Sequence, residues 1–489
     1  MYFIGVDLGT TNLKAALYDG SISCVARESE KVSYDRSENR VELDIEQYYE
    51  SFSAMIRRLL AKSGVPAGEI RSIGFTGQAE TLVILGEDGR PLMNAISWMD
   101  ERSKEECEEL AELFSAEEIR RVTGQMAVLP TWPATKILWL KKNRPEIWRK
   151  AARYLLLKDY MIWKMTGKML CDMSIATFSF YFDIYRKCYW KKMMDAVGIR
   201  PDQLPPLAEP NTCAGNVRAE AAKDTGLSEQ TVVNIGTLDH FAGMIGTGNI
   251  TTEGVSLSTG TVMALAVMAE EPADPDCGIA MHYGFLPDTH VMLPVVESGG
   301  VSLEWFRSAC MKGTGYDEIN EELAKRVPLK GPIFLPYIVG VNPPEFDPDA
   351  TGVFWGLRQE HDAVDMAGAV MEGVACILRR NCDSIRQTGT GIERIIATGG
   401  GAKSAVWCQM QADLTGLPVV VPKDSEAACL GAAIAAAAGC GAYRDFGEAC
   451  AKAVSMERQY TPRKLPEQEK RYRRFCALYE ATRSIGSIE

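Results

Sequence analysis

Three short turns rich in glycine and hydroxyl side chains occur in this sequence, and each follows an apolar run. The first turn is Gly9-Thr10-Thr11-Asn12. Its backbone N–H groups can approach a phosphate chain closely, because glycine leaves no side chain in the way. Lys14 beyond the turn could supply a cation, and Asp7 before it could hold a hydrated Mg²⁺. Taken alone, an ordinary hairpin turn with an exposed lysine explains this segment equally well.

The other two turns lie in the second half of the chain. They are Ser258-Thr259-Gly260-Thr261 and Thr398-Gly399-Gly400-Gly401-Ala402-Lys403-Ser404. A glycine turn that joins a strand to a helix can hold a phosphate or a flat ligand against its backbone. A single turn of this kind is usually only a tight connection, but three of them after apolar strands together favour a nucleotide site.

Asp239 lies between a predicted strand and a predicted helix of small residues, in N-I-G-T-L-D-H-F-A-G. Phosphoryl transfer to an alcohol needs a carboxylate within hydrogen-bond reach of the attacking hydroxyl. A lone aspartate in this context is more often the N-cap of the helix. The spacing leaves both interpretations open.

The segments that carry the first two turns have the same predicted structure. Residues 2–7 and 13–18 are apolar runs joined so closely that they can only be antiparallel neighbours, and residues 22–26 are expected to form a third strand. Residues 255–258 and 262–267 repeat this strand–turn–strand pattern around the second turn. The repetition indicates an internal duplication.

Apolar spacing predicts the remaining elements. Helices are expected at residues 45–60, 103–121, 136–140, 152–163, 363–385, 404–414 and 427–438, and further strands at 70–75 and 394–397. The last of these helices is mostly alanine and too short to span a bilayer, so we expect it to be buried. No G-x-G-x-x-G fingerprint leads into a helix, which argues against a Rossmann fold.

The overall composition excludes several classes of protein. The 489 residues are 46% hydrophobic and 24% charged, enough for two or three domains with large cores. A formal net charge of −12 argues against a nucleic-acid or anionic-membrane surface. No secretory leader is apparent, and the 14 cysteines include no C-x-x-C pair, so we expect a cytoplasmic protein with reduced thiols. Only four histidines occur, which disfavours chemistry built on several of them.

Five segments, in order, resemble the FGGY family of carbohydrate kinases, and the resemblance covers nearly the whole chain. The opening G-V-D-L-G-T-T-N-L-K resembles the family's first phosphate loop. One family signature is similar to T-W-P-A-T-K-I-L-W-L-K-K-N, in which Thr131 replaces the usual residue. A second family signature is similar to G-V-F-W-G-L together with D-M-A-G-A-V-M-E. G-G-G-A-K-S-A-V-W-C-Q-M-Q-A-D-L-T-G is very similar to the adenosine motif of xylulokinases, and E-A-A-C-L-G-A-A-I resembles the closing helix.

The resemblance implies an α/β fold of two actin-like (ribonuclease H-like) ATPase domains with a cleft between them. The expected domains are residues 1–246 and 247–489, with a hinge near residues 246–254. Asp239 matches the family's catalytic base, and Asp239 and Asp7 are expected to hold Mg²⁺ through water. The residues expected to bind ATP are Asp7, Gly9, Thr10, Thr11, Asn12, Lys14, Thr259, Gly260, Gly300, Glu304, Gly400, Gly401 and Ala402.

The substrate wall is expected in two segments, T-G-Q-A-E-T at residues 76–81 and A-I-S-W-M-D-E-R at residues 95–102. Xylulokinases typically have G-Q-M-H-G at the first place and glycerol kinases Q-R-E-T. This chain has Ala79 in place of that arginine. The expected substrate-binding residues are Gln78, Glu80, Trp98, Asp100 and Asp239. For Trp98, a core aromatic is the alternative.

The sequence therefore predicts a sugar kinase that moves a phosphate from ATP, with Mg²⁺, to a hydroxyl of a small sugar. A ketose, most of all a pentulose such as xylulose, is the expected substrate, and glycerol or another polyol is the alternative. Two other classes are an ATP-gated module without catalysis and a sugar sensor that has lost catalysis. They would add a substrate-binding domain or a DNA-binding segment, and neither is seen. The expected partners are the small sugar or polyol and a second copy of the chain in a homodimer, with no nucleic acid and no membrane.

Overall fold

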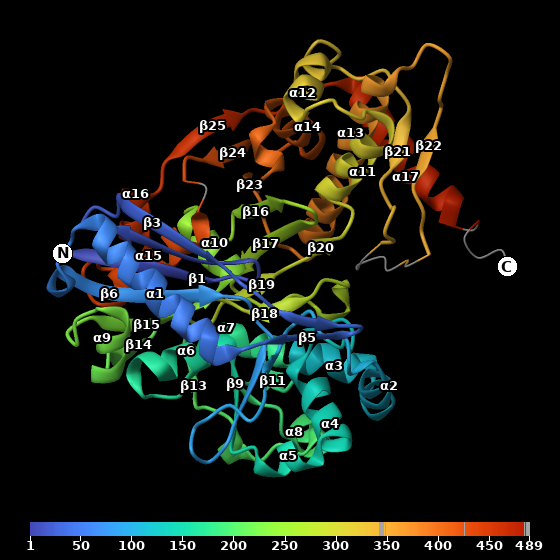
Figure 1. The fold of residues 1–489 in the computed structure, drawn as a ribbon. Coiled ribbons are helices and arrows are strands. Elements are labelled where there is room, and N and C mark those ends of the chain that lie inside the picture. Colours follow the sequence, from blue (N-terminus) through green and yellow to red (C-terminus); the bar gives the residue numbers. More distant parts are fainter. Residues whose placement is uncertain (342–346, 348, 425, 484, 486–489) are drawn as a thin grey trace.

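Two large mixed β-sheets organise the chain. The structure is a computed structural model, and it describes residues 1–341, 347, 349–424, 426–483 and 485. Figure 1 shows one sheet among the elements of the first half of the chain and the other among those of the second half.

The first sheet has the strand order β14-β15-β6-β1-β2-β3. Its strands are β1 (Tyr2–Leu8), β2 (Asn12–Tyr18), β3 (Cys24–Lys31), β6 (Ile70–Gly77), β14 (Cys213–Asn216) and β15 (Val232–Leu238). β1 and β2 pair antiparallel with Asp7 opposite Lys14, as predicted for two runs joined by so short a turn. β6 lies parallel to β1 on one side and to β15 on the other.

The second sheet has the strand order β18-β19-β17-β16-β23-β24-β25. Its strands are β16 (Gly254–Thr259), β17 (Met263–Ala269), β18 (Met281–Tyr283), β19 (His290–Met292), β23 (Arg394–Gly399), β24 (Val419–Pro422) and β25 (Met456–Tyr460). From β19 to β25 the pairs run antiparallel, antiparallel, parallel, parallel and antiparallel, the same series as from β3 to β14. The two sheets therefore have the topology of a duplicated fold.

A third sheet and several short strands complete the strand structure. The third sheet has the order β4-β5-β8-β7-β9 and consists of β4 (Asp35–Ser37), β5 (Arg40–Leu43), β7 (Leu82–Leu85), β8 (Ala95–Ile96) and β9 (Arg153–Leu156). The short strands are β10 (Cys171–Asp172), β11 (Phe182–Asp183), β12 (Cys188–Tyr189), β13 (Leu207–Ala208), β21 (Ile333–Leu335) and β22 (Val353–Trp355), and β20 (Val295–Val296) adds to the second sheet by pairing with β17.

Helices cover these sheets and connect their strands. In the first half they are α1 (Ile45–Ser63), α2 (Lys104–Leu113), α3 (Ala116–Thr123), α4 (Pro133–Asn143), α5 (Pro145–Lys150), α6 (Leu157–Thr166), α7 (Met173–Ala176), α8 (Lys191–Val197), α9 (Ala219–Thr225) and α10 (Asp239–Gly246). In the second half they are α11 (Gly300–Cys310), α12 (Tyr316–Ala324), α13 (Ala363–Gln387), α14 (Ala405–Thr415), α15 (Ala427–Gly439), α16 (Phe446–Ala453) and α17 (Pro466–Arg483).

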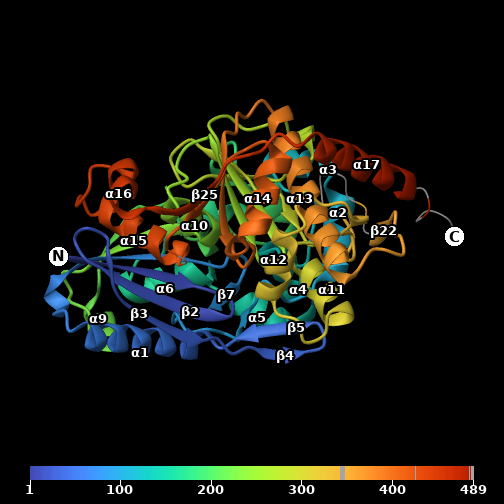
Figure 2. The same ribbon diagram turned by 90° about the horizontal axis from the view of Figure 1, so that it is seen from above.

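The two faces of the first sheet are covered by helices from different parts of the chain. α1 packs with β2, β3 and α9 on one face, while α15 packs against β1, β6 and α10 on the other (Figures 1 and 2). Two glycines permit this second contact. A Cβ on Gly5 would lie 1.8 Å from the carbonyl oxygen of Cys429, and one on Gly74 would lie 2.2 Å from that of Ala432. The alanine-rich helix is therefore buried, as predicted, but against the sheet of the first half.

Two predicted helices are wrong in their extent. The acidic segment 103–121 forms two helices, because Ser115 begins a new one by accepting a hydrogen bond from the backbone of Glu118 at 3.1 Å. The segment 152–163 begins as strand β9, which pairs antiparallel with β7, and only then becomes α6. A short apolar run does not distinguish a buried strand from a buried helix. The third strand also starts later than predicted, at Cys24.

The other predicted helices are present, and several are longer than predicted. Those at 45–60, 363–385, 404–414 and 427–438 differ at their ends from α1, α13, α14 and α15 by three residues or fewer. No helix in the described part of the chain combines the length and the apolar character that crossing a bilayer requires.

Candidate active site

A cavity of about 610 Å³ lies where three backbone segments of the second half meet. These segments are the β16–β17 turn, the start of α11 and the β23–α14 turn. The residues that line the cavity are Thr259, Gly260, Thr261, Gly300, Val301, Leu303, Glu304, Tyr316, Asp317, Ile319, Asn320, Met371, Gly400, Gly401, Lys403, Ser404 and Trp407. The structure thus brings together both glycine turns of the second half and two further predicted residues, Gly300 and Glu304.

Close backbone approaches create this cavity. The N–H of Gly300 donates to the carbonyl of Gly260 at 2.9 Å, so the start of α11 is docked on the β16–β17 turn. On the other side, a Cβ on Gly401 would lie 2.7 Å from the Cβ of Thr259. Gly399 adopts a φ of 78°, a left-handed conformation that favours glycine. These glycines are needed because the backbone segments themselves form the walls.

Glu304 is held in place at the edge of the cavity. Its carboxylate accepts hydrogen bonds from Arg307 at 2.8 Å, from Ser308 at 2.8 Å and from the Tyr316 hydroxyl. The bond from Arg307 contributes most to lowering the pKa of Glu304 to about 2. Ala402, by contrast, is buried, does not line the cavity, and its carbonyl accepts a bond from Arg458 at 3.1 Å. The side chain of Ala402 therefore does not border this cavity, and its contact with adenine or ribose stays a prediction.

Several lining residues were not identified from the sequence. They include Tyr316 and Asn320 on α12, Met371 on α13 and Trp407 on α14. Trp407 is buried and donates from its indole to the carbonyl of Met371 at 3.0 Å, which fixes α14 against α13. An amphipathic helix pattern identifies such residues as buried, but it does not show which of them borders a cavity.

The first glycine turn joins β1 to β2 and lies between Asp7 and Lys14. Lys14 Nζ forms an ion pair with Glu426 Oε2 at 2.7 Å, just before α15 begins. Burial opposes the charge of this lysine, but the bond to Glu426 prevails and the pKa of Lys14 is raised. The lysine therefore has a carboxylate partner from the far end of the chain as well as its place beside the turn.

Two carboxylates lie close enough to influence one another at this end of the sheet. Burial, followed by the nearby Asp239, raises the pKa of Asp7 to about 7. Two acids that repel in this way suit a divalent cation, because the cation would relieve the repulsion. Within the described residues, no group of three or more histidine, cysteine, aspartate or glutamate side chains could hold a metal ion. A cation here would therefore need water or a ligand phosphate to complete its coordination.

Asp239 is the first residue of α10, directly after β15. The N-cap position belongs to Leu238, so the structure does not support the alternative that Asp239 is the cap. Its Oδ1 accepts the backbone N–H of His240 at 2.6 Å, and the side chain is half-buried. A carboxylate at a helix N-terminus is also stabilised by the helix dipole. This arrangement holds Asp239 in place and leaves part of it accessible.

Glu80 has an unusual backbone conformation beside these acids. Its φ is 57°, in the left-handed region that non-glycine residues rarely adopt. Burial raises the pKa of Glu80, and the charge of Asp239 adds to the rise, while Lys136 opposes it. Local strain of this kind persists where the surrounding structure imposes it, often at functional sites. Because the charge of Asp239 contributes to the raised pKa of Glu80, the Glu80 carboxyl lies near the predicted catalytic base.

Lys136 supports the predicted substrate wall from the interior of the protein. It is fully buried, and its Nζ donates to the carbonyls of Ser97 and Thr131 at 2.7 Å each. These bonds fix the residue before Trp98, whose side chain is 38% exposed. A core position, the alternative for Trp98, is therefore wrong. Lys136 was seen in the sequence only as part of a family signature, since nothing local showed which carbonyls it would meet.

Asp100 does not present a free carboxylate to a ligand. It is fully buried, its Oδ2 accepts the N–H of Val41 at 2.6 Å, and both of its oxygens accept bonds from the Arg102 guanidinium at 2.7 and 2.8 Å. The predicted contact of Asp100 with substrate hydroxyls therefore has no support in this geometry. Its chemistry is that of a buried ion pair that shapes the loop after Trp98.

Replacing Asp100 with alanine should therefore affect stability more than substrate binding. Removing one member of a buried pair leaves a buried charge poorly compensated, so we expect unfolding to become easier by about 3 kcal/mol. The KM for the sugar should change by less than about twofold. Urea unfolding and steady-state kinetics measure the two quantities. A stable variant with a greatly raised sugar KM would return Asp100 to the substrate site.

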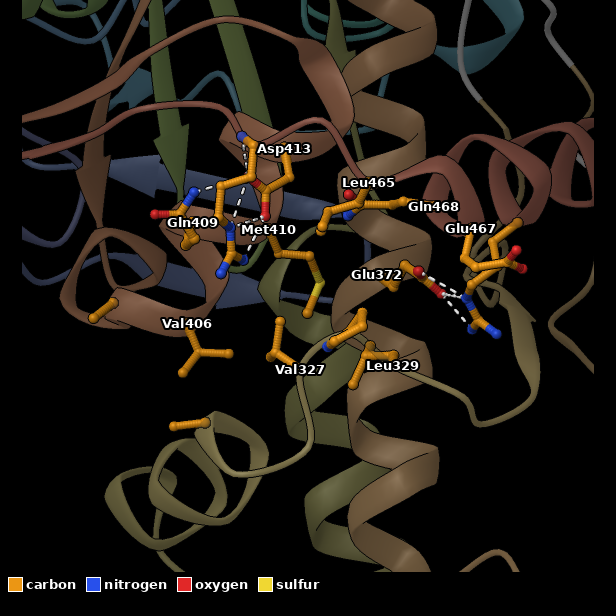
Figure 3. Close-up of a pocket in the computed structure, with 15 residues that line it drawn as sticks. Val327, Leu329, Glu372, Val406, Gln409, Met410, Asp413, Leu465, Glu467 and Gln468 are labelled. Atoms are coloured by element: carbon orange, nitrogen blue, oxygen red, sulfur yellow. Dashed lines mark hydrogen bonds and ion pairs between the residues drawn. The ribbon is translucent and has the colours of Figure 1, made fainter.

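A second cavity, of about 230 Å³, is lined by residues of α14, the segment 327–329 and the start of α17 (Figure 3). Its charged groups are already paired, Asp413 with Arg463 at 2.6 Å and Glu372 with Arg471 at 2.5 Å. None of the residues predicted for ATP or substrate lines it. The residues predicted for ATP and substrate lie instead around the first cavity and near the acids at the end of β1.

Comparison with known proteins agrees with this geometry. The N-terminal and C-terminal domain models of the FGGY family of carbohydrate kinases match residues 2–246 and 255–440. The xylulose kinase of Bacillus subtilis (strain 168) is 29% identical over 490 residues, covering 98% of this chain and 96% of that protein. The gluconokinase of Bacillus licheniformis is 27% identical over 491 residues, covering 98% and 94%. The crystal structure of xylulose kinase from Rhodospirillum rubrum matches with a TM-score of 0.93 at 25% identity, covering 100% of both chains. This chain belongs to the FGGY family of carbohydrate kinases and is a sugar phosphotransferase of the actin-like ATPase fold.

Proposed function

We propose that this enzyme transfers the terminal phosphate of ATP to a hydroxyl of a small neutral sugar, with Asp239 as the base. The observation that carries the proposal is the position of Asp239, which is close enough to Asp7 and Glu80 to influence the pKa of both. Asp7 adjoins the first phosphate turn and Glu80 belongs to the substrate wall. Asp239 thus lies between the place expected for the phosphate and the place expected for the hydroxyl.

The proposed reaction needs little covalent help from the protein. As the sugar oxygen forms its bond to phosphorus, its proton passes to the Asp239 carboxylate and the bond from phosphorus to the ADP oxygen breaks. Backbone N–H groups of the turns 9–12 and 259–261 would hold the phosphates, and the 610 Å³ cavity would hold adenine and ribose. Thr10, Thr11, Asn12 and Lys14 lie on or just after the first of these turns.

Mg²⁺ is proposed as the accompanying cation. Asp7 and Asp239 would hold it through water, and the mutual repulsion seen in the raised pKa of Asp7 is consistent with a site built for positive charge. When bound, the ion would neutralise charge on the phosphates. The protein's own part is to hold the two carboxylates together at the end of β1 and the start of α10.

A ketose, most of all a pentulose such as xylulose, is the proposed substrate. Support comes from the kinases named for xylulose among its relatives and from an adenosine motif of their type. Glycerol or another polyol is the second candidate, because Gln78, Glu80 and Thr81 match the residues that glycerol kinases have there. The relative named for gluconate adds a sugar acid to the substrates that must be tested.

We further propose two domains, residues 1–246 and 247–489, that close on the substrates about a hinge near residues 246–254. Closure would exclude water that could otherwise accept the phosphate. A cytoplasmic location and a homodimer are proposed with this function. Light scattering of the purified protein measures the assembly directly.

The proposed function predicts ADP release that depends on an added sugar. In a panel of ketoses, polyols and sugar acids with Mg-ATP, at least one neutral ketose or polyol should raise ADP release tenfold or more above the sugar-free rate. Product analysis should show one phosphate monoester per ADP. A coupled assay and phosphorus NMR measure both. Equal ADP release with and without every member of the panel would contradict the proposal.

A further inference from the structure

A ring of hydrogen bonds joins the first phosphate turn to the substrate wall. The indole N–H of Trp98 donates to Thr10 Oγ1 at 2.9 Å, and its backbone N–H donates to Thr81 Oγ1 at 3.2 Å. The Thr81 hydroxyl donates to Gln78 Oε1 at 2.8 Å, and Gln78 Nε2 donates to the carbonyl of Gly9 at 3.4 Å. The ring therefore begins and ends in the same turn.

Two side chains of this ring are buried and fixed. Thr81 is fully buried and Gln78 is 4% exposed, while Lys136 anchors the carbonyl of Ser97 from beneath. Hydrogen-bond networks in such surroundings hold their members in position. Trp98 is the partly open member, because 38% of its surface is exposed. A ligand can reach the indole at this point of the ring.

The indole N–H determines how the Thr10 hydroxyl can act. An indole nitrogen only donates, whereas a threonine hydroxyl has one proton to donate and two lone pairs to accept with. Because Trp98 donates to Thr10, the proton of the Thr10 hydroxyl remains available for another acceptor. Phosphate oxygens are acceptors, and Thr10 lies in the turn proposed to hold them.

We propose that Trp98 is a positioning residue that links sugar binding to phosphate binding. A sugar packed against the open side of the indole fixes the ring, and the indole N–H then holds the Thr10 hydroxyl as a donor to the transferred phosphate. This inference rests on the proposed function, since it places a sugar at Trp98 and a phosphate at Thr10. It also supplies a reason for phosphate transfer to favour sugar over water, because Thr10 is best oriented when the sugar is present.

A double-mutant cycle on nucleotide binding tests the link without any sugar. Trp98→Phe removes the N–H and keeps an aromatic ring, and Thr10→Val removes the hydroxyl and keeps the shape. Each should weaken binding of the non-hydrolysable analogue AMP-PNP with Mg²⁺ by about three- to tenfold, as expected for one hydrogen bond. The double variant should bind AMP-PNP with about the same affinity as the single variant that binds it more weakly. The affinity of Thr10→Ser should stay within about twofold of the wild type. Losses that multiply in the double variant, measured by calorimetry, would overturn the proposal.

Measurements of catalysis distinguish a failure of the Trp98–Thr10 link from a failure of the proposed function. In Trp98→Phe, kcat should fall about tenfold and the ratio of ADP released to sugar phosphate formed should rise. Trp355→Phe, a matched change at a 49% exposed tryptophan on β22, should leave both unchanged. A variant whose sugar KM alone rises would overturn the link and leave Trp98 as a sugar contact only. A wild-type enzyme that phosphorylates no sugar would refute the proposed function, while the binding cycle would still decide the Trp98–Thr10 link.

Discussion

Replacing Asp239 with asparagine should lower kcat by about 10²–10⁴-fold, the usual contribution of a positioned general base. Asparagine keeps the size of the side chain and can still accept the N–H of His240, which Asp239 Oδ1 now accepts at 2.6 Å. What it loses is a group that can take the proton of the sugar hydroxyl. The KM for ATP should change little, because the nucleotide cavity lies in the second half of the chain.

His240 provides the matched control for this prediction. It is adjacent in sequence and exposed, and an imidazole is the other common base in proteins. His240→Asn should retain most of the kcat under the same conditions. If the histidine variant loses activity while the aspartate variant keeps it, the assignment of the base is wrong. Mg-ADP should raise the melting temperature of both variants, which shows that they are folded.

The parts of this site that depend on local sequence were predictable. A polar turn between two apolar runs can only form a hairpin, so Asp7 and Lys14 were correctly placed on either side of it. Glycine at 300 is required by its close approach to the carbonyl of Gly260, and glycine at 401 by the side chain of Thr259, and both stand in glycine-containing segments identified from the sequence. The same holds for Asp239, whose strand and helix were both predicted around it.

The parts that depend on distant partners were not predictable from local patterns. Glu426 lies 412 residues from Lys14, and no pattern near either residue pairs them. Asp100 was expected to bind the substrate because it lies near Trp98 in the segment 95–102, but Arg102 and Val41 occupy its oxygens. Local sequence does not distinguish a carboxylate in a buried ion pair from one that binds a ligand. Only the arrangement of their neighbours distinguishes them.

Replacing Glu80 with alanine should raise the KM for the sugar by about 10- to 150-fold and the KM for ATP by less than about twofold. The range applies at pH 9, where Glu80, whose pKa burial raises to about 8, is ionised, and it follows from the loss of hydrogen bonds to a charged group, about 1.5–3 kcal/mol. The left-handed backbone at Glu80 and the buried Lys136 beneath it direct the carboxyl to the same region as Asp239. Steady-state kinetics with each substrate varied in turn measure both constants. Equal rises in the two would move Glu80 out of the sugar site.

Glu80 should also determine whether the enzyme prefers a neutral sugar or a negatively charged sugar acid. At pH 9, above the pKa of about 7 for Asp7 and about 8 for Glu80, both raised mainly by burial, these two carboxylates are charged, while Lys136 is buried with its Nζ donating to backbone carbonyls, so a carboxylate on the sugar would meet repulsion. We expect the wild type to use xylulose well and gluconate poorly. Glu80→Gln keeps the shape and removes the charge that Glu80 carries at pH 9, so at that pH the ratio of kcat/KM for gluconate to that for xylulose should rise about tenfold, equivalent to about 1.4 kcal/mol of repulsion. Asp100→Asn, which changes a buried acid paired with Arg102, should leave this ratio unaltered and controls for a general loss of charge. A wild type that prefers gluconate, or a ratio that Glu80→Gln does not change, would show that the negative charge of Glu80 plays no part in selecting the sugar.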